Sequence, residues 1–111
     1  MKPLVWLGTS RADLKRFPAK PRRIAGFQLW RVQLGLEPND WRPMRSVGTG
    51  VEEIRVHTGI DVRVLYVAKF WEGVYVLHAF EKKTRRTTSQ DLELAKERFR
   101  LLVAERRKRE G

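Results

Sequence analysis

The chain has 111 residues, 41% of them hydrophobic, which is enough for one compact core but not for two, because domains commonly run to about 100–150 residues. Its 24 Lys and Arg outweigh 13 Asp and Glu, and the formal net charge of +11 favours polyanionic partners, nucleic acid first. The apolar runs fall far short of the ~20 residues that span a bilayer. The chain has no cysteine, which argues against a disulfide framework, and it has only two histidines, which argues against a structural zinc site. We therefore expect one soluble, cytoplasmic domain over residues 1–111, with no membrane partner, no metal and no cofactor.

The first third of the chain predicts one strand and two helices. Lys2–Leu7 is a short apolar run closed by Gly8, which is typical of a strand. The residues after it predict a short helix that Pro18 ends, and a second helix is expected from about Pro21 to Gly35. The second helix should bury an apolar stripe made of Ile24, Phe27, Trp30 and Leu34.

The middle of the chain predicts a long loop followed by three strands. Residues 36–50 hold prolines and glycines without helical or strand periodicity, which indicates a loop. Apolar and polar residues then alternate in Val51–Thr58 and Val62–Phe70, and Val74–Phe80 is almost wholly apolar. A turn at Gly59 joins the first two strands, so a consecutive antiparallel meander is the simplest topology.

The last quarter of the chain predicts a long helix. Thr88 with Asp91 three residues later resembles a capped start, and the helix should run to about Arg109. Its buried stripe is expected to be Leu92, Ala95, Phe99 and Leu102. The order of elements predicts an α+β domain with the helices on one face of an antiparallel sheet.

Two strands of this sheet should place cations on one surface. If the strands pair through the Gly59 turn, Arg55 and Arg63 lie on the same face, with His57 and Glu53 close by. Like charges repel, so such a cluster makes sense where a phosphate arrives to neutralise it. The alternative is an ordinary solvated sheet face on which Glu53 is the local counter-ion.

A basic run follows the third strand. Lys82, Lys83, Arg85 and Arg86 are held by the packing of that strand, so they can bind phosphate in a defined place, although a solvated loop is the competing interpretation. His78, inside the strand, is either a hydrogen-bonded core residue or a catalyst, and His57 is the better-exposed histidine.

No sequence context for a Ser/His/Asp triad, no glycine-rich phosphate loop and no carboxylate cluster for a metal stands out. The remaining chemistry is chemistry that cations can do. RNA carries its own nucleophile, the 2′-hydroxyl, and a cationic site can cut RNA by aligning that hydroxyl with the adjacent phosphate and stabilising the charge that develops.

Several blocks resemble a known family. Gly50–Arg55, the Arg-Val-Leu-Tyr core of Val62–Val67, Tyr75–Thr84 and a final helix with Ala95 and Arg98 follow one another as in the HigB-like, phage-derived branch of the RelE/ParE toxin superfamily. The likeness covers roughly residues 2–104. It implies a RelE-like fold, toxicity through mRNA cleavage that usually occurs on the translating ribosome, and neutralisation by an antitoxin that often carries a helix-turn-helix.

The resemblance also implies functional residues. The catalytic positions carried over by motif are Arg55, Arg63 and Lys83, with Lys82 adjacent. We also expect RNA contacts at His57, Lys69, Lys82, Arg85 and Arg86. Many RelE-type enzymes place a tyrosine or histidine near the C-terminus for proton transfer, but here neither follows His78, so proton transfer is left open among His57, His78, Glu53 and a lysine. The alternatives are a ParE-like inhibitor of DNA gyrase on the same fold and a non-catalytic basic RNA-binding module.

Overall fold

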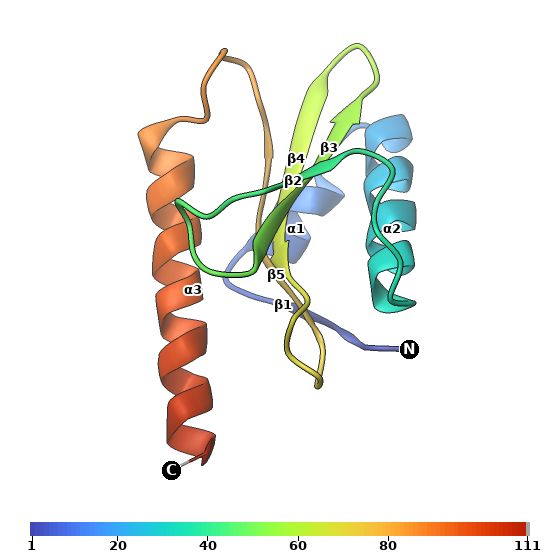
Figure 1. Cartoon of the computed structure of the whole chain (residues 1–111). Helices are drawn as coiled ribbons and strands as arrows, with labels where there is room; N and C mark the ends of the chain where they lie inside the picture. Colours follow the sequence, from blue (N-terminus) through green and yellow to red (C-terminus); the bar gives the residue numbers. More distant parts are fainter. Residues whose placement is uncertain (111) are drawn as a thin grey trace.

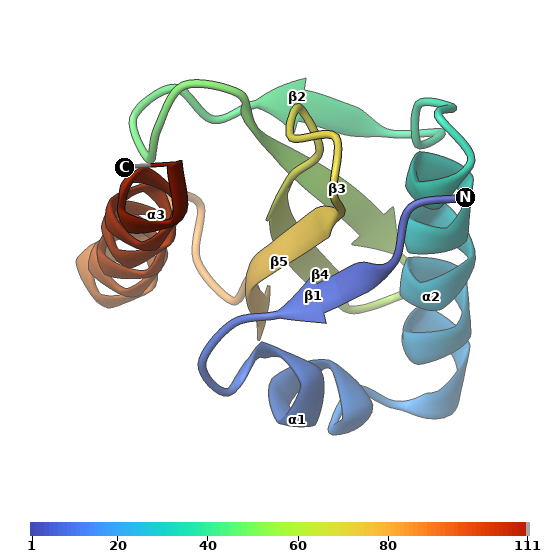
Figure 2. The same cartoon turned by 90° about the horizontal axis from the view of Figure 1, so that it is seen from below.

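A central sheet lies between helices in the structure, a computed structural model that describes residues 1–110. In chain order the elements are β1 (Leu4–Trp6), α1 (Ser10–Lys15), α2 (Ala19–Gln33), β2 (Trp41–Pro43), β3 (Val51–His57), β4 (Asp61–Val67), β5 (Val74–Glu81) and α3 (Ser89–Glu110). Figure 1 shows α2 and α3 on either side of the sheet, and α1 lies near its β1 edge, as Figure 2 makes clear from below. The α+β class expected from the sequence is confirmed.

The strand order is β1-β5-β4-β3-β2. The antiparallel meander of β3, β4 and β5 is confirmed, but β1 pairs with β5 in parallel, so the sheet is mixed rather than antiparallel. β2 forms inside the stretch expected to be a loop and pairs antiparallel with β3. The sequence predicts β1 as a strand but not its parallel pairing, and it misses β2, which has only three residues and is too short to show a period of two.

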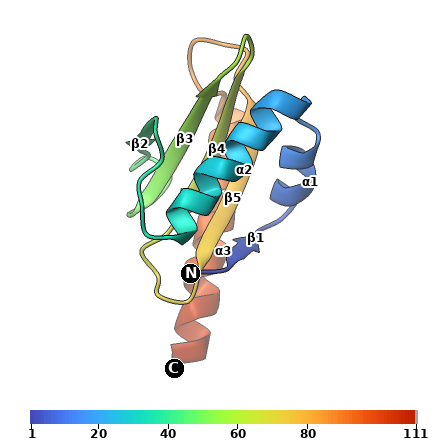
Figure 3. The same cartoon turned by 90° about the vertical axis from the view of Figure 1, so that its right-hand side faces the viewer.

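The expectation that all helices cover one face is wrong. Helices α2 and α3 lie on opposite sides of the sheet (Figures 2 and 3). One apolar cluster joins the sheet to α1 and α2, and a second joins the sheet to α3. The cause is in the strands: Val64 and Tyr66 face α2, while Leu65 and Val67 between them face α3, and all four are fully buried. A sheet that is apolar on both faces needs cover on both faces.

Helix α2 turns a different face to the sheet from the one expected. Its buried residues are Pro21, Ala25, Gln28, Leu29 and Val32. The large side chains of the expected stripe, Phe27, Trp30 and Leu34, are instead 45–49% exposed. Because the helix is apolar on two sides, periodicity alone does not choose between them, and the small Ala25 lets the helix approach the sheet closely.

Helix α3 packs as the sequence predicts. Ala95 and Leu102 are buried, and Leu92 and Phe99 pack against the same cluster. The connection between β2 and β3 supports this packing, because Gly48 lies so close to the Phe99 ring that an added Cβ would be 2.3 Å from it. The second core is thus closed by α3 and by this loop.

Candidate nucleic-acid interface

Three guanidinium groups lie side by side on the α3 face of the sheet, near the β3–β4 turn. Arg55 and Arg63 are direct partners across β3 and β4, as the position of the Gly59 turn predicts. Arg42 of β2 is the direct partner of Glu53 in β3. The charged end of the sheet, as we call this region, consists of Asp40, Arg42, Glu53, Arg55, His57, Asp61 and Arg63.

Glu53 and Arg63 form the buried base of the charged end. The Glu53 side chain is fully buried, and the Arg63 side chain is only 6% exposed. Arg42 Nε donates a hydrogen bond of 2.8 Å to Glu53 Oε1, and Arg63 Nε lies 3.6 Å from the same oxygen. Glu53 Oε2 and Arg63 Nε have no hydrogen-bond partner within residues 1–110. The position of Arg63 in a central strand, between β3 and β5, buries most of its side chain.

His57 and Arg55 form the accessible part of the charged end. Arg55 Nε and Nη2 each lie 2.9 Å from Asp40 Oδ1. His57 Nδ1 lies 2.6 Å from Asp61 Oδ1, and His57 Nε2 lies 3.3 Å from Asp40 Oδ2. The hydrogen bond with His57 holds the pKa of the Asp61 carboxyl below its ordinary value, and the nearby positive charges of Arg63 and Lys82 act in the same direction. With its side chain 51% exposed, His57 is an imidazole that a ligand can reach.

An irregularity in β5 places His78 on the α3 face. Leu65 pairs with His78 and Tyr66 pairs with Val76, so Leu77 is an extra residue in the β5 side of the ladder. Strict alternation would turn His78 toward α2 together with Val76. The bulge turns it to α3, and its ring stacks on Phe80 at 5.0 Å between centroids.

Both ring nitrogens of His78 have polar neighbours on α3. Nε2 lies 2.7 Å from Asp91 Oδ1, and Nδ1 lies 3.5 Å from Arg98 Nη1. Asp91 is itself fixed by the helix cap, because its backbone N–H donates to Thr88 Oγ1 and the Thr88 hydroxyl donates to Asp91 Oδ2. An imidazole that is 5% exposed and held at both nitrogens joins β5 to α3, which fits the hydrogen-bonded core interpretation of His78 better than proton transfer.

The basic loop, which comprises residues 82–86, lies at the same end of the sheet as the β3–β4 turn (Figures 1 and 3). The backbone N–H of Lys82 donates a 2.7 Å hydrogen bond to the Asp61 carbonyl, which ties the start of the loop to the charged end. Lys83, Arg85 and Arg86 are exposed. None of the four loop cations forms an ion pair with any part of the chain that the structure describes.

A protein-family model described as "Phage derived protein Gp49-like (DUF891)" matches residues 12–100, which is well over half of the chain. The chain belongs to the Gp49-like family. This family is RelE-like and linked to the toxins of toxin–antitoxin systems, so an antitoxin is its implied partner. No curated protein matches the chain. The matched residues of this Gp49-like chain include the whole charged end and the basic loop.

The structure brings most of the expected site residues together. Arg55, Arg63, His57 and Glu53 share the charged end, and Lys82, Lys83, Arg85 and Arg86 adjoin it through the loop. Lys69 does not join them, because it follows the opposite end of β4, where its Nζ lies 5.2 Å from the centre of the Phe70 ring. Its grouping with the other RNA contacts is therefore not supported by the fold.

Four polar residues of the charged end and of the contacts around His78 were not predicted from the sequence. They are Asp40, Arg42, Asp91 and Arg98 in their roles as partners of Arg55, Glu53 and His78. Asp91 gave a signal as a capping residue and Arg98 as part of the family pattern, but neither signal points to His78. Asp40 and Arg42 lie in the unpredicted β2 region, and nothing in their sequence context pairs them with β3.

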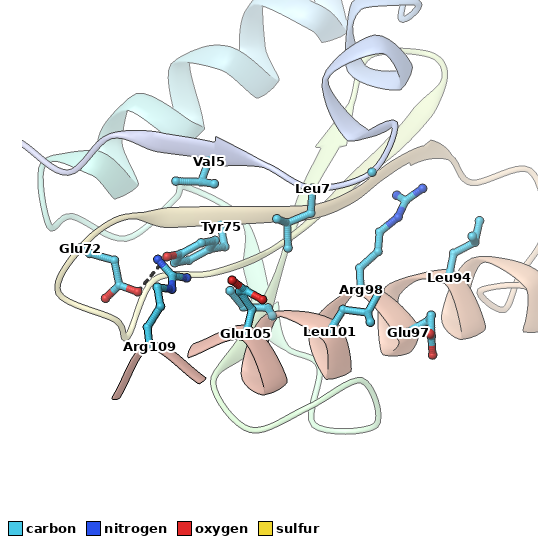
Figure 4. Close-up of a pocket in the computed structure, with 12 residues that line it drawn as sticks. Val5, Leu7, Glu72, Tyr75, Leu94, Glu97, Arg98, Leu101, Glu105 and Arg109 are labelled. Carbon is cyan, nitrogen blue, oxygen red and sulfur yellow. Dashed lines mark hydrogen bonds between the residues drawn. The ribbon is translucent and has the colours of Figure 1, made fainter. Parts of the chain in front are cut away.

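A separate apolar groove of about 800 Å³ lies between β1 and α3 (Figure 4). Figure 4 shows Val5 and Leu7 on one side and Leu94 and Leu101 on the other. Its charged residues have both signs, among them Arg98 and several glutamates. This groove holds none of the residues of the charged end.

Among residues 1–110, no three His, Cys, Asp or Glu side chains are grouped so that they could hold a metal ion. Within the same range, no helix combines the length and the apolar character that a membrane crossing needs.

Proposed function

We propose that this Gp49-like protein is a HigB-like toxin that cleaves mRNA on the translating ribosome without a metal ion. The observation that carries the proposal is that the four cations of the basic loop, which have no ion-pair partner within residues 1–110, lie beside the arginine-rich charged end of the sheet. Cations that lack an internal counter-ion are free to bind the phosphates of a polyanion.

The reaction uses the 2′-hydroxyl of the RNA as the nucleophile. The 2′-oxygen attacks the adjacent phosphorus and loses its proton, and the bond from phosphorus to the 5′-oxygen breaks as that oxygen gains a proton. The products are a 2′,3′-cyclic phosphate and a 5′-hydroxyl end. No redox agent or further reactant is needed, so positioning, charge stabilisation and proton transfer are the only tasks left to the protein.

The accessible side chains suit these tasks. Arg55 and Lys83 provide positive charge for the phosphoryl oxygens, and a lysine of the basic loop supplies the proton to the leaving oxygen. His57 is the candidate general base, because its side chain is half exposed and carboxylates orient it. Arg63 contributes its positive charge from within the sheet, where it lies buried between its ladder partners Arg55 and Phe80. Glu53 keeps that charge in place.

Induction of the protein alone in bacteria tests the proposal. We expect growth arrest together with new 5′ ends in several cellular mRNAs, mapped by primer extension. Growth arrest with intact mRNA and trapped gyrase–DNA complexes would overturn the proposal in favour of the ParE-like alternative. RNA binding without any new ends would instead leave the non-catalytic RNA-binding module.

A further inference from the structure

The outer face of α2 carries an apolar surface that the fold does not use. Phe27, Trp30 and Leu34 project from the side of the helix opposite the buried Ala25 and Leu29. Gly26 beside them adds no side chain, and an added Cβ there would meet nothing within 4 Å. The rings of Phe27 and Trp30 already contact each other, with 5.7 Å between centroids.

The end of α2 extends this surface. Gly35 has a φ of +84°, its N–H donates to the Val32 carbonyl, and the N–H of Leu36 donates to the Arg31 carbonyl. These two bonds form a Schellman motif, which turns the chain back beside the last turn of the helix. Leu36 is 49% exposed at this turn. The α2 stripe, as we name it, consists of Phe27, Trp30, Leu34 and Leu36.

The charged residues of α2 itself are all cationic, and the acidic Glu37 and Glu52 lie only at the Leu36 end of the α2 stripe. Between residues 14 and 36 the chain has no Asp or Glu, and its cations are Lys15, Arg16, Lys20, Arg22, Arg23 and Arg31. Arg16 pairs with Asp13, whereas the four cations from Lys20 to Arg31 have no ion-pair partner within residues 1–110. A partner that covers the stripe must therefore bring negative charge with its apolar residues.

We propose that the α2 stripe is the docking surface for an acidic, amphipathic segment of the antitoxin. Trp and Arg are among the residues that most often dominate protein–protein binding energy. Along α2, Trp30 lies between Arg23 and Arg31. The proposal rests on the toxin–antitoxin assignment but not on RNA cleavage. The stripe belongs to α2, which covers the sheet face opposite the one that carries the charged end.

Other occupants fit this surface less well. A second copy of the chain would set one cationic surface against another, which costs binding energy. RNA could stack on Phe27 and Trp30, but half of the stripe is leucine, which offers no ring for a base. An acidic protein segment satisfies both the aliphatic and the cationic parts.

The test is whether this chain binds the proteins encoded by the two adjacent reading frames. Each of these proteins is co-expressed with this chain, and the affinity of the pair is then measured by calorimetry. We expect one of them to bind. Phe27→Gln/Trp30→Gln should weaken that binding at least about 30-fold, as the loss of a hot spot does. Arg23→Glu/Arg31→Glu should weaken it about 10-fold or more, with a loss of salt dependence. The matched control is Leu94→Gln/Leu101→Gln in the β1–α3 groove, where the leucines have similar exposure and the variant should bind normally.

Each other outcome overturns the proposal. Binding that survives both α2 variants, or that only the groove variant weakens, places the partner elsewhere. Failure of both neighbouring proteins to bind also contradicts it, whatever the RNA cleavage assay gives. If the α2 variants lose RNA binding while partner binding is intact, the stripe is an RNA surface. Circular dichroism establishes that each variant is folded, which is expected because all the changed side chains are at least partly exposed.

Discussion

The α3 side of the sheet has two ends of opposite character. At one end Leu65, Val67 and Leu77 are fully buried beneath the helix. At the other end the same face of the same sheet carries Arg55 and Arg63. Strand alternation decides only that these residues share a face, and the change from leucine to arginine occurs at the edge of the apolar cluster under α3, where Phe80 pairs with Arg63.

The difference between the two ends separates the scaffold from the candidate site. Apolar side chains at the positions of Glu53 and Arg63, on the face of Leu65, would stabilise the fold. Burial of the Glu53 and Arg63 charges instead costs several kcal/mol per ion before the attraction between the two charges offsets this cost. A face built for stability alone does not need these charges. Their position beside an accessible histidine and the basic loop gives them a use in phosphate binding.

The largest effect on stability should come from the apolar end. Leu65→Ala removes a fully buried side chain from the second core and should lower the free energy of unfolding by about 2–5 kcal/mol. Urea denaturation of the two proteins measures the difference. A loss below about 1 kcal/mol would mean that the space collapses around the alanine and that the two ends differ less than we infer.

The basic loop should show the opposite behaviour. Lys83→Ala removes an exposed cation and should lower RNA cleavage about 10²–10³-fold, while the free energy of unfolding changes by less than about 0.5 kcal/mol. Lys108→Ala, which removes an exposed lysine near the end of α3, is the matched control and should cleave almost normally. Equal cleavage by both variants would remove Lys83 from the site.

Arg63 lies between these extremes. Arg63→Ala leaves the buried Glu53 with Arg42 as its remaining partner, so we expect a loss of about 2–3 kcal/mol of stability in addition to any loss of cleavage. Glu53→Gln in the Arg63→Ala background should restore part of that stability, since it removes a buried carboxylate charge that has lost one of its two cationic neighbours. Thermal denaturation of the two single variants and the double variant gives the coupling. Strictly additive losses would show that the two groups do not interact.

The smallest effect should appear at the far end of α3. Hydrogen bonds from Arg106, and a further one from Tyr75, lower the pKa of Glu72 from its ordinary value to about 2. Because this pKa is depressed in the folded state, the contribution is complete above pH 4.5 and disappears as the pH falls toward 2. Glu72→Gln should cost about 1 kcal/mol or less at neutral pH, and its deficit relative to the natural chain should shrink in acid. A deficit that does not change between pH 7 and pH 2, measured by urea denaturation, would contradict the role of this pair.

The parts of the fold that could be predicted are those in which one residue pattern has one structural solution. The alternation from Val51 to Val67 with a turn at Gly59 predicts β3 and β4, and it also places Arg55 opposite Arg63. The parallel addition of β1 to β5 leaves no such pattern, because it depends on where the chain returns after two helices. The orientation of α2 is ambiguous for another reason: Phe27 and Trp30 on one side and Leu29 and Val32 on the other are both apolar stripes.

The candidate site could be predicted in composition but not in accessibility. Strand parity gives the face of Arg63, but its burial depends on β5 and Phe80 on one side and on Glu53 on the other. The position of His78 depends on a one-residue bulge, which reverses the face that alternation gives it. Its partner Asp91 belongs to another element, so only the packing of α3 brings the two together.

Replacement of a single 2′-hydroxyl in the substrate tests the central claim most directly. A cleavage site is first mapped on an mRNA translated in vitro with the protein, and the nucleotide on the 5′ side of the cut is then replaced by its 2′-deoxy form. We predict that cleavage at that position is lost, and that the unmodified RNA yields 2′,3′-cyclic phosphate and 5′-hydroxyl ends. Continued cleavage at the 2′-deoxy nucleotide, or fragments with 5′-phosphate ends, would contradict the proposed reaction.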